Sequence, residues 1–207
     1  VDVVATLCGE RVREIDGYHF KALPVLDDED AIVARTGYTG EDGFELYVKN
    51  SVVVSLWDAA LRAGAVPCGL ACRDTLRLEA GMCLYGNDID DDTTPWEAKL
   101  GWTVKMAKDN FVGKAALAAQ REAGVPRALI SMVVDKRIAR HGHPVLVGGE
   151  ARGVVTSGSR SPTRGDNIAL AYVPRGQGRP GTVHEIDVRG RIAKATVVKG
   201  PFFRRDY

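Results

Sequence analysis

The sequence predicts an α+β protein, in which a mixed helix and strand domain is followed by a small antiparallel barrel or sandwich. Two observations lead to this prediction. Residues 1–96 mix short strand patterns with amphipathic helices, whereas short apolar segments separated by glycine turns fill most of residues 97–207. A chain of 207 residues is long enough for one large domain or two small ones. We therefore expect two domains that meet between residues 96 and 97.

The first domain opens on an apolar segment, Val1–Leu7, which has the pattern of a strand or of a buried segment. A chain that begins inside an element is typical of a fragment or a processed product. Further along, Ala31–Arg35 is a short apolar run and Phe44–Val48 alternates between apolar and polar residues. Both are predicted to be strands, and residues 36–43, with three glycines in eight positions, form the loop between them.

Two helices complete this domain. Ser51 is predicted to cap the N-terminus of a helix over residues 52–63, which has one apolar stripe and ends at Gly64. A second helix is predicted over Leu70–Ala80, and Gly81 is its natural C-cap.

The second domain is predicted to begin with a helix over Phe111–Ala123, closed by Gly124. Short strands follow. The dipeptides Gly148-Gly149 and Arg189-Gly190 are predicted to form the turns of two hairpins. Regular spacing of such strands is typical of a small barrel or sandwich. The six predicted strands are Ala128–Val134, Pro144–Val147, Gly153–Ser157, Ile168–Val173, Thr182–Val188 and Arg191–Val198.

Composition narrows the functional classes. The chain is 45% hydrophobic and 27% charged, an ordinary globular composition, and no apolar run approaches the roughly 20 residues that span a bilayer. The formal net charge of +1 creates no general attraction for nucleic acid or for a membrane surface. We therefore expect neither as a partner.

The cysteine and histidine patterns do not predict a metal site. His141 and His143 flank one glycine and have no evident third ligand, and the cysteines lack the spacing of a zinc site. We expect all four cysteines to be reduced core residues of an intracellular protein. They are Cys8, Cys68, Cys72 and Cys83.

Three features could carry chemistry. In the glycine loop, Tyr38 is free to project, although such a loop is also typical of a solvated hairpin tip. Glu45 lies in the following strand, on the opposite face from Phe44 and Leu46. Arg73 lies early in a helix with apolar neighbours, where it is either a plain surface arginine or a partner for a carboxylate or heterocycle edge.

The third feature is the C-terminal segment 201–207, which is aromatic and basic. A terminal segment is often frayed. Three aromatic residues in seven favour docking instead.

Several long motifs resemble those of the glycine cleavage T proteins. The first is RTGYTGEDGFEL, from Arg35 to Leu46, and the second is GLACRDTLRLEAGMCLYGND, from Gly69 to Asp88. Shorter matches continue in the same order almost to the end of the chain, at residues 94–95, 100–104, 156–162, 168–173 and 179–181. The chain therefore resembles the C-terminal part of this family.

The resemblance implies a fold and a reaction. Residues 1–96 are expected to be part of a folate-binding aminomethyltransferase-type α+β domain, here incomplete, and residues 97–207 the family's C-terminal β-barrel. The family moves a one-carbon unit from an aminomethyl group on the lipoyl arm of the H protein to tetrahydrofolate, and releases ammonia. The resemblance thus implies tetrahydrofolate as the acceptor, lipoylated H protein as the partner, a monomer, and the bacterial cytoplasm or the mitochondrial matrix.

The resemblance also implies which residues bind folate. Glu45 and Arg73 match folate-site positions, Tyr38 matches a tyrosine that lines the same site, and Tyr207 matches a substrate contact. Arg204 or Arg205 could meet the glutamate carboxylates of folate by position alone. The catalytic aspartate of the family belongs to a segment upstream of Val1, so we assign no catalytic residue here and expect this chain alone to be inactive.

Two alternatives stay open. The folate domains of sarcosine and dimethylglycine dehydrogenases are similar, and there the domain acts beside a flavin domain. The chain could also be a non-catalytic folate-binding module that functions as it stands.

Overall fold

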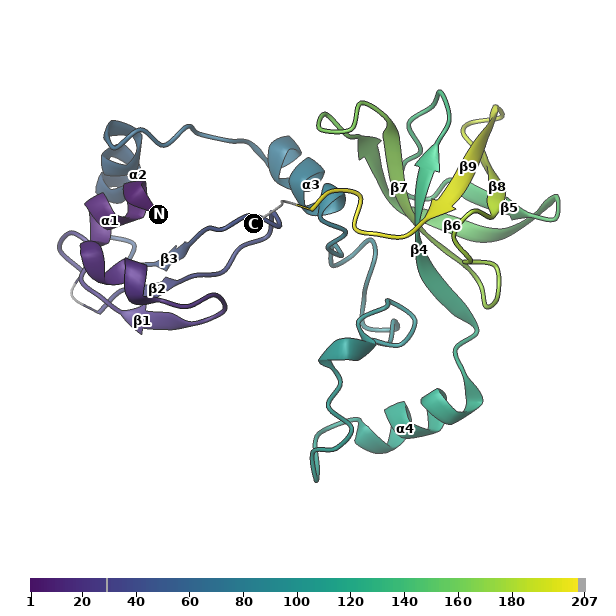
Figure 1. Ribbon diagram of the computed structural model, residues 1–207, viewed down its shortest axis with the longest axis horizontal. Helices are drawn as coiled ribbons and strands as arrows, with labels where there is room; N and C mark the ends of the chain where they lie inside the picture. Colours follow the sequence, from purple (N-terminus) through teal and green to yellow (C-terminus); the bar gives the residue numbers. More distant parts are fainter. Residues whose placement is uncertain (29, 205–207) are drawn as a thin grey trace. The chain divides into compact units, whose positions relative to one another are not determined.

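The computed structural model describes residues 1–28 and 30–204. It divides into two compact units, one formed by residues 1–74 and the other by the residues from Thr75 on, and each is described here by itself (Figure 1). The division into compact units falls between residues 74 and 75. It does not test the predicted domain boundary between residues 96 and 97, which stays a prediction.

The first unit is built on a three-stranded antiparallel sheet. Its strands β1 (Phe20–Ala22), β2 (Ile32–Ala34) and β3 (Glu45–Tyr47) lie in sequence order. Val33 of the middle strand pairs with Leu46 on one side and Lys21 on the other. The two predicted strands are therefore present as β2 and β3.

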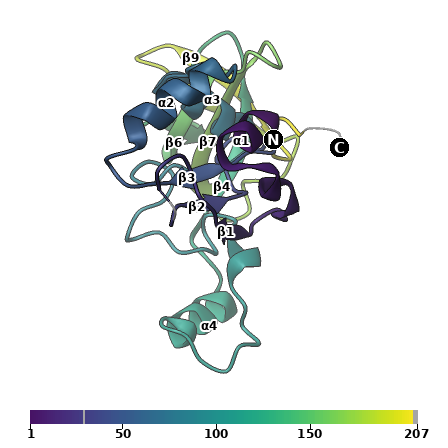
Figure 2. The same ribbon diagram turned by 90° about the vertical axis from the view of Figure 1, so that its left-hand side faces the viewer.

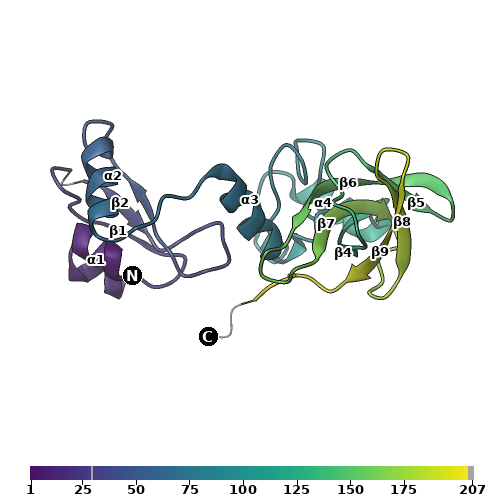
Figure 3. The same cartoon turned by 90° about the horizontal axis from the view of Figure 1, so that it is seen from above.

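Helices cover one face of this sheet. α1 (Asp2–Cys8), the 3-10 helix η1 (Glu10–Glu14) and α2 (Val53–Arg62) all contribute to the core, and α1 and α2 lie side by side (Figure 3). The core side chains come from both the helices and the sheet: Ala5, Cys8, Val12, Ile15, Leu23, Val25, Ala31, Val33 and Leu56.

Three local predictions about this unit differ from the structure. The apolar segment Val1–Leu7 is helical rather than extended, because its buried residues Ala5 and Cys8 are spaced for one face of a helix. The N-cap of α2 is Val52, and no side chain caps it, so Ser51 lies just outside the helix. Of the predicted apolar stripe only Leu56 is buried, whereas Val53, Trp57 and Leu61 are exposed.

Helix α3 runs from Leu70 to Glu79, one residue short of the predicted end at Ala80. Gly81 adopts a positive φ of 72°, which a residue without a Cβ tolerates best. The Met82 amide then donates to the Arg77 carbonyl at 2.8 Å, and the Gly81 amide donates to the Leu78 carbonyl at 2.9 Å. These bonds satisfy carbonyl groups that the helix end would otherwise leave without partners.

The second unit contains a closed antiparallel barrel. Its strand order is β4-β7-β6-β5-β8-β9, with β9 pairing back to β4 (Figure 1). The strands are β4 (Arg127–Val134), β5 (Pro144–Val147), β6 (Glu150–Arg160), β7 (Asn167–Pro174), β8 (Val183–Asp187) and β9 (Ile192–Val198). All six predicted strands are confirmed, and the architecture is a barrel rather than a sandwich.

Both predicted hairpin turns are present. Gly148 and Gly149 have φ angles of 65° and 87°, and Arg189 and Gly190 have φ angles of 57° and 78°. Two consecutive positive φ angles match the right-handed twist of antiparallel strands, so such turns favour tight hairpins.

Strand β7 is buried on both faces, which explains its nearly continuous apolar sequence. Ala169, Ala171 and Val173 point into the barrel core. Ile168, Leu170 and Tyr172 point outward and are covered by Leu78 and Phe202.

The C-terminal segment therefore docks as far as the structure describes it. Phe202 is buried, and the Phe203 amide donates to the Glu79 carbonyl at 2.9 Å. The docked segment closes an outer apolar layer on the barrel.

The connection from α3 to the barrel contains the short 3-10 helix η2 (Gly101–Thr103) and α4 (Lys114–Ala123) (Figure 2). No residue of α4 is buried. Glu97 ties this connection to β4, because its carboxylate accepts from the Thr94 amide at 3.0 Å and from Arg127 Nε at 2.9 Å. Burial alone would raise the pKa of Glu97, but these hydrogen bonds outweigh burial and hold the pKa below its ordinary value.

A buried arginine joins α3 to the barrel. Arg77 Nη1 donates to Asp88 Oδ2 at 2.6 Å, and Arg77 Nη2 donates to Ser157 Oγ on β6 at 2.7 Å. The side chains of Arg77 and Asp88 are 2% and 0% exposed. The Leu84 amide and the Ser157 hydroxyl also donate to Asp88 Oδ2. The charge pair is therefore enclosed and hydrogen-bonded within the second unit.

Glu79, also at the end of α3, makes a second buried polar connection to the barrel unit. Its carboxylate accepts from the hydroxyls of Ser161 and Thr163 and from the Thr163 amide. Because Glu79 is buried, these donors replace the water that it loses on folding.

Arg77→Met is expected to lower the free energy of unfolding of the barrel unit by about 3–5 kcal/mol, because the Asp88 carboxylate is left buried without its cation. Denaturant unfolding followed by circular dichroism measures this change. The control is Arg152→Met, which removes an exposed arginine from β6. Equal stability of the two variants would contradict the role given to Arg77.

Glu97→Gln is expected to make the stability of the protein depend less on pH in the acid range. Since the pKa of Glu97 is lower in the folded state, its stabilising contribution is complete above about pH 4.5, its ordinary value, and is lost as the pH falls through the folded-state pKa. Thermal midpoints between about pH 6 and pH 3 should therefore fall less for Glu97→Gln than for the native protein. Glu150→Gln, on an exposed position of β6, should follow the native curve.

Candidate functional site

The glycine loop between β2 and β3 is held by an arginine at its base. Arg35 Nε and Nη2 donate to the two carboxylate oxygens of Asp42 at 2.8 and 2.9 Å. Arg35 Nη1 also donates to the Ile15 carbonyl at 3.0 Å. A bidentate pair of this kind fixes orientation as well as distance, so residues 36–41 form a restrained loop rather than a loose tip.

Tyr38 and Arg73 come together in the first unit. The Arg73 Cζ atom lies 4.8 Å from the centroid of the Tyr38 ring. Tyr38 is half-buried, and Arg73 is exposed in the first turn of α3. Stacking on an aromatic ring holds the guanidinium in place while its exposed edge can still donate hydrogen bonds.

Glu45 lies on the sheet face opposite the core, as its alternation with Phe44 and Leu46 predicts. In the sheet register, Glu45 pairs with Ala34, and Ala34 pairs with Phe20. The same face carries Ile32 and Tyr47, and Phe20, Ile32 and Tyr47 are 67%, 41% and 58% exposed. Glu45 is thus a half-buried carboxylate on an open face rich in apolar side chains.

The Glu45 carboxylate has a local partner. The Thr36 hydroxyl donates to Glu45 Oε2. Thr36 lies two residues before Tyr38, so this bond ties the strand that carries Glu45 to the loop that carries Tyr38.

The remaining predicted site residues lie at the C-terminus, where the structure describes the chain only as far as Arg204. Tyr207 and Arg205 lie outside the described residues. Arg204 is exposed, at the end of the described segment. The structure brings Tyr38 and Arg73 into contact, and the assignment of Tyr38, Glu45, Arg73 and Tyr207 to a folate site stays a prediction.

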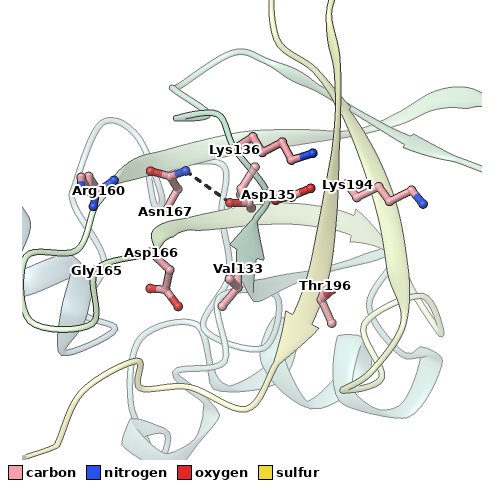
Figure 4. A pocket seen from close by; sticks show the side chains of 10 residues that line it. Val133, Asp135, Lys136, Arg160, Gly165, Asp166, Asn167, Lys194 and Thr196 are labelled. Carbon is pink, nitrogen blue, oxygen red and sulfur yellow. Dashed lines mark hydrogen bonds between the residues drawn. The ribbon is translucent and has the colours of Figure 1, made fainter.

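A cavity of about 420 Å³ lies at one side of the barrel, but the charges around it do not converge (Figure 4). Arg160 lies with Asn167 at one end, whereas the side chains of Lys136 and Lys194 extend the other way. Asn167 Nδ2 donates to the Val134 carbonyl at 3.4 Å. A groove with cations and carboxylates arranged in this way does not define one ligand class.

The cysteines differ from the prediction. Cys8 is buried, Cys83 is half-buried, and Cys68 and Cys72 are both exposed. Burial raises the pKa of the Cys8 and Cys83 thiols to about 11. The apolar residues that flank Cys68 and Cys72 in the sequence suggested a core position, but Val66 and Leu70 are themselves exposed.

Sequence reasoning missed the buried polar groups. Arg77 follows Leu76 in the predicted helix, but the sequence pattern predicted no role for it. An arginine on an apolar helix face is itself a sign of a buried ion pair. Its partners Asp88 and Ser157 could not be chosen from spacing, because Ser157 lies 80 positions away.

Two family models match the chain. The model of the GCVT N-terminal domain matches residues 1–108, and that of the glycine cleavage T-protein C-terminal barrel domain matches residues 127–204. The chain belongs to the glycine cleavage T-protein family. The resemblance inferred from the motifs is therefore confirmed.

Curated relatives and a solved structure agree with the family. The aminomethyltransferase of Rippkaea orientalis is 54% identical over 188 residues, covering 90% of this chain and 50% of the relative. That of Thermosynechococcus vestitus is 46% identical over 203 residues, covering 98% and 55%. The crystal structure of glycine cleavage system aminomethyltransferase T from Bartonella henselae matches with a TM-score of 0.88 and 34% identity, covering 94% of this chain and 55% of the other.

The chain thus spans about half the length of the relatives that it matches. Among the described residues, no helix is both long and apolar enough to cross a membrane.

Arg35→Lys is expected to loosen the glycine loop without unfolding the first unit. Lysine keeps the charge but cannot make the two parallel bonds to Asp42 together with the bond to Ile15. Amide hydrogen exchange of residues 36–44 should become faster, while that of α1 and α2 should change little. Unchanged exchange in the loop would show that Arg35 does not restrain it. Arg62→Lys, at the end of α2, is the matched control.

Proposed function

We propose that this chain forms part of a tetrahydrofolate-dependent aminomethyltransferase of the glycine cleavage system. In this reaction the carbon–sulfur bond of an aminomethyl-lipoyl arm on the H protein breaks. The carbon joins tetrahydrofolate as 5,10-methylenetetrahydrofolate, the amine leaves as ammonia, and the lipoyl arm is left as a dithiol. The names of the relatives support this activity, and the contact between Tyr38 and Arg73 supports a part for these two residues in it.

The contact between Tyr38 and Arg73 is the observation that carries the proposal. These two residues come from different motifs, and both match folate-site positions of the family. A flat aromatic ring and an adjacent guanidinium suit a ligand that combines a planar heterocycle with polar or anionic groups. Tetrahydrofolate is such a ligand.

Glu45 is proposed to read the edge of the pterin. A carboxylate accepts hydrogen bonds from two adjacent N–H groups, and the pterin ring offers an amino group and a ring N–H side by side. The Thr36 hydroxyl, which donates to Glu45 Oε2, orients the carboxylate. The apolar side chains on the same sheet face can contact the rest of the heterocycle.

No catalytic residue is assigned to this chain. Its proposed role is to bind and orient tetrahydrofolate, and Tyr207 is proposed as a further substrate contact. The family's catalytic aspartate is proposed to lie upstream of Val1, so turnover requires a longer protein. We further propose that the protein is a monomer of the bacterial cytoplasm, or of the mitochondrial matrix if its source is a eukaryote.

Glu45→Gln is expected to weaken tetrahydrofolate binding by about 10- to 150-fold, because it removes a charged acceptor worth about 1.5–3 kcal/mol. Isothermal titration calorimetry of this chain with tetrahydrofolate measures the change. Glu150→Gln, an exposed carboxylate on the barrel, should bind as the native chain does.

Two results would count against the proposal. If Glu45→Gln binds as tightly as the native chain, Glu45 does not contact the ligand. If the native chain shows no binding at millimolar tetrahydrofolate, the described residues do not form a folate site by themselves.

A further inference from the structure

A groove with a volume of about 300 Å³ lies on the barrel where β4, β7 and β6 are neighbours. Val154 of β6 pairs with Tyr172 of β7, and Tyr172 pairs with Leu129 of β4. Arg127 of β4 and Arg152 of β6 both line the groove, and none of the described residues that line it is acidic. The groove therefore carries charge of one sign, unlike the one in Figure 4, where cations and a carboxylate are mixed.

Arg127 is held in one orientation by its neighbours. Its Cζ atom lies 4.4 Å from the centroid of the Tyr172 ring. Its Nε donates to Glu97 Oε1 at 2.9 Å, and its Nη2 donates to Thr93 Oγ1 at 3.2 Å. Within the part of the chain that the structure describes, Nη1 donates no hydrogen bond. Arg127 thus keeps free N–H groups on a guanidinium that is already fixed, so a ligand has little side-chain entropy to offset.

Arg152 enters the groove from an irregular position in β6. Gly153 pairs with Val145 of β5 and Ala151 pairs with Leu146, so β6 carries one extra residue, Arg152, at this point. A bulge of this kind turns a side chain away from the direction that regular alternation would give it. Arg152 is exposed, and its side chain makes no hydrogen bond or ion pair with any residue that the structure describes.

The rest of the lining is apolar or lacks a side chain. It consists of Ala151, Gly153, Val154, Tyr172 and Val173. The Val154 side chain is partly exposed, at 36%. A ligand with an apolar body gains by covering this surface, whereas a small inorganic anion does not. Two guanidinium groups beside an apolar surface match a carboxylate on an organic body, because guanidinium and carboxylate form parallel hydrogen bonds.

We propose that this groove binds a small organic carboxylate. The carboxylate lies between Arg127 and Arg152, and the apolar body covers Val154. The property is independent of the proposed folate site, because Tyr38, Glu45 and Arg73 belong to the first unit and the groove belongs to the second.

The test is a titration of the ¹⁵N-labelled chain with benzoate at constant ionic strength, followed by nuclear magnetic resonance of the backbone amides. The amide signals of residues 152–154 should shift and saturate with a dissociation constant of about 1–10 mM, as expected for a ligand of this size. Benzamide has the same apolar ring without the charge and should bind at least about tenfold more weakly. Inorganic phosphate has the charge without the ring and should also bind more weakly than benzoate.

Substitution of each arginine tests the two sides of the groove. Arg152→Gln should weaken benzoate binding by at least about fivefold, because it removes one charged donor. Arg160→Gln, at the other exposed end of β6, is the matched control and should bind as the native chain does. Arg127→Lys keeps a cation beside Glu97, so the variant should fold, but it removes the guanidinium edge and should also weaken binding.

Four results would overturn the proposal. They are the absence of saturable shifts at residues 152–154 up to about 50 mM benzoate, well above the expected dissociation constant, equal binding of benzoate and benzamide, tighter binding of phosphate than of benzoate, and native affinity in Arg152→Gln. The amide spectrum of each variant shows whether it is folded.

Discussion

The barrel unit depends on the compensation of one buried cation. Arg77 is enclosed, so its guanidinium requires a carboxylate and further acceptors at short range. Asp88 and Ser157 meet this requirement from the connection after α3 and from strand β6, and the Asp88 carbonyl in turn accepts from the Tyr172 hydroxyl on β7 at 2.9 Å. This network is directional, whereas apolar packing alone would tolerate rotation of the helix end. It therefore specifies where the end of α3 lies on the barrel.

The strands form a closed barrel in one unit and an open three-stranded sheet in the other, and this difference bears on function. The barrel closes on itself, so all its strands are paired on both sides, and its interior is filled with side chains. The sheet of the first unit has β1 and β3 at its edges and an open face with Phe20, Tyr47 and Glu45. Closure favours stability, whereas an open face leaves side chains available for a ligand. Tyr38, Glu45 and Arg73, which are proposed to bind folate, lie in the open unit.

Much of the fold followed from local patterns in the sequence. The barrel strands were predicted because their turns use residues that tolerate positive φ, such as the Gly148-Gly149 pair, and such turns are specified locally. The sheet face of Glu45 followed from the period of two along a strand. The hydrogen-bond partners of Arg77 could not be predicted, because tertiary packing brings them together from distant parts of the sequence. The exposure of Cys68 and Cys72 was missed for the same reason, since apolar neighbours in the sequence do not ensure a buried environment.

Arg73 and Arg77 show how burial divides the roles of identical side chains. They lie four residues apart on α3, a spacing that places them on one helix face. Arg77 is buried, and its hydrogen bonds to Asp88, Ser157 and Met82 serve the fold. Arg73 is exposed and lies against the Tyr38 ring, which orders its guanidinium without removing it from solvent. A ligand can therefore recruit Arg73 at little cost in desolvation, whereas recruiting Arg77 would break the network that holds α3 to the barrel. One helix thus supplies both a structural cation and a cation suited to binding.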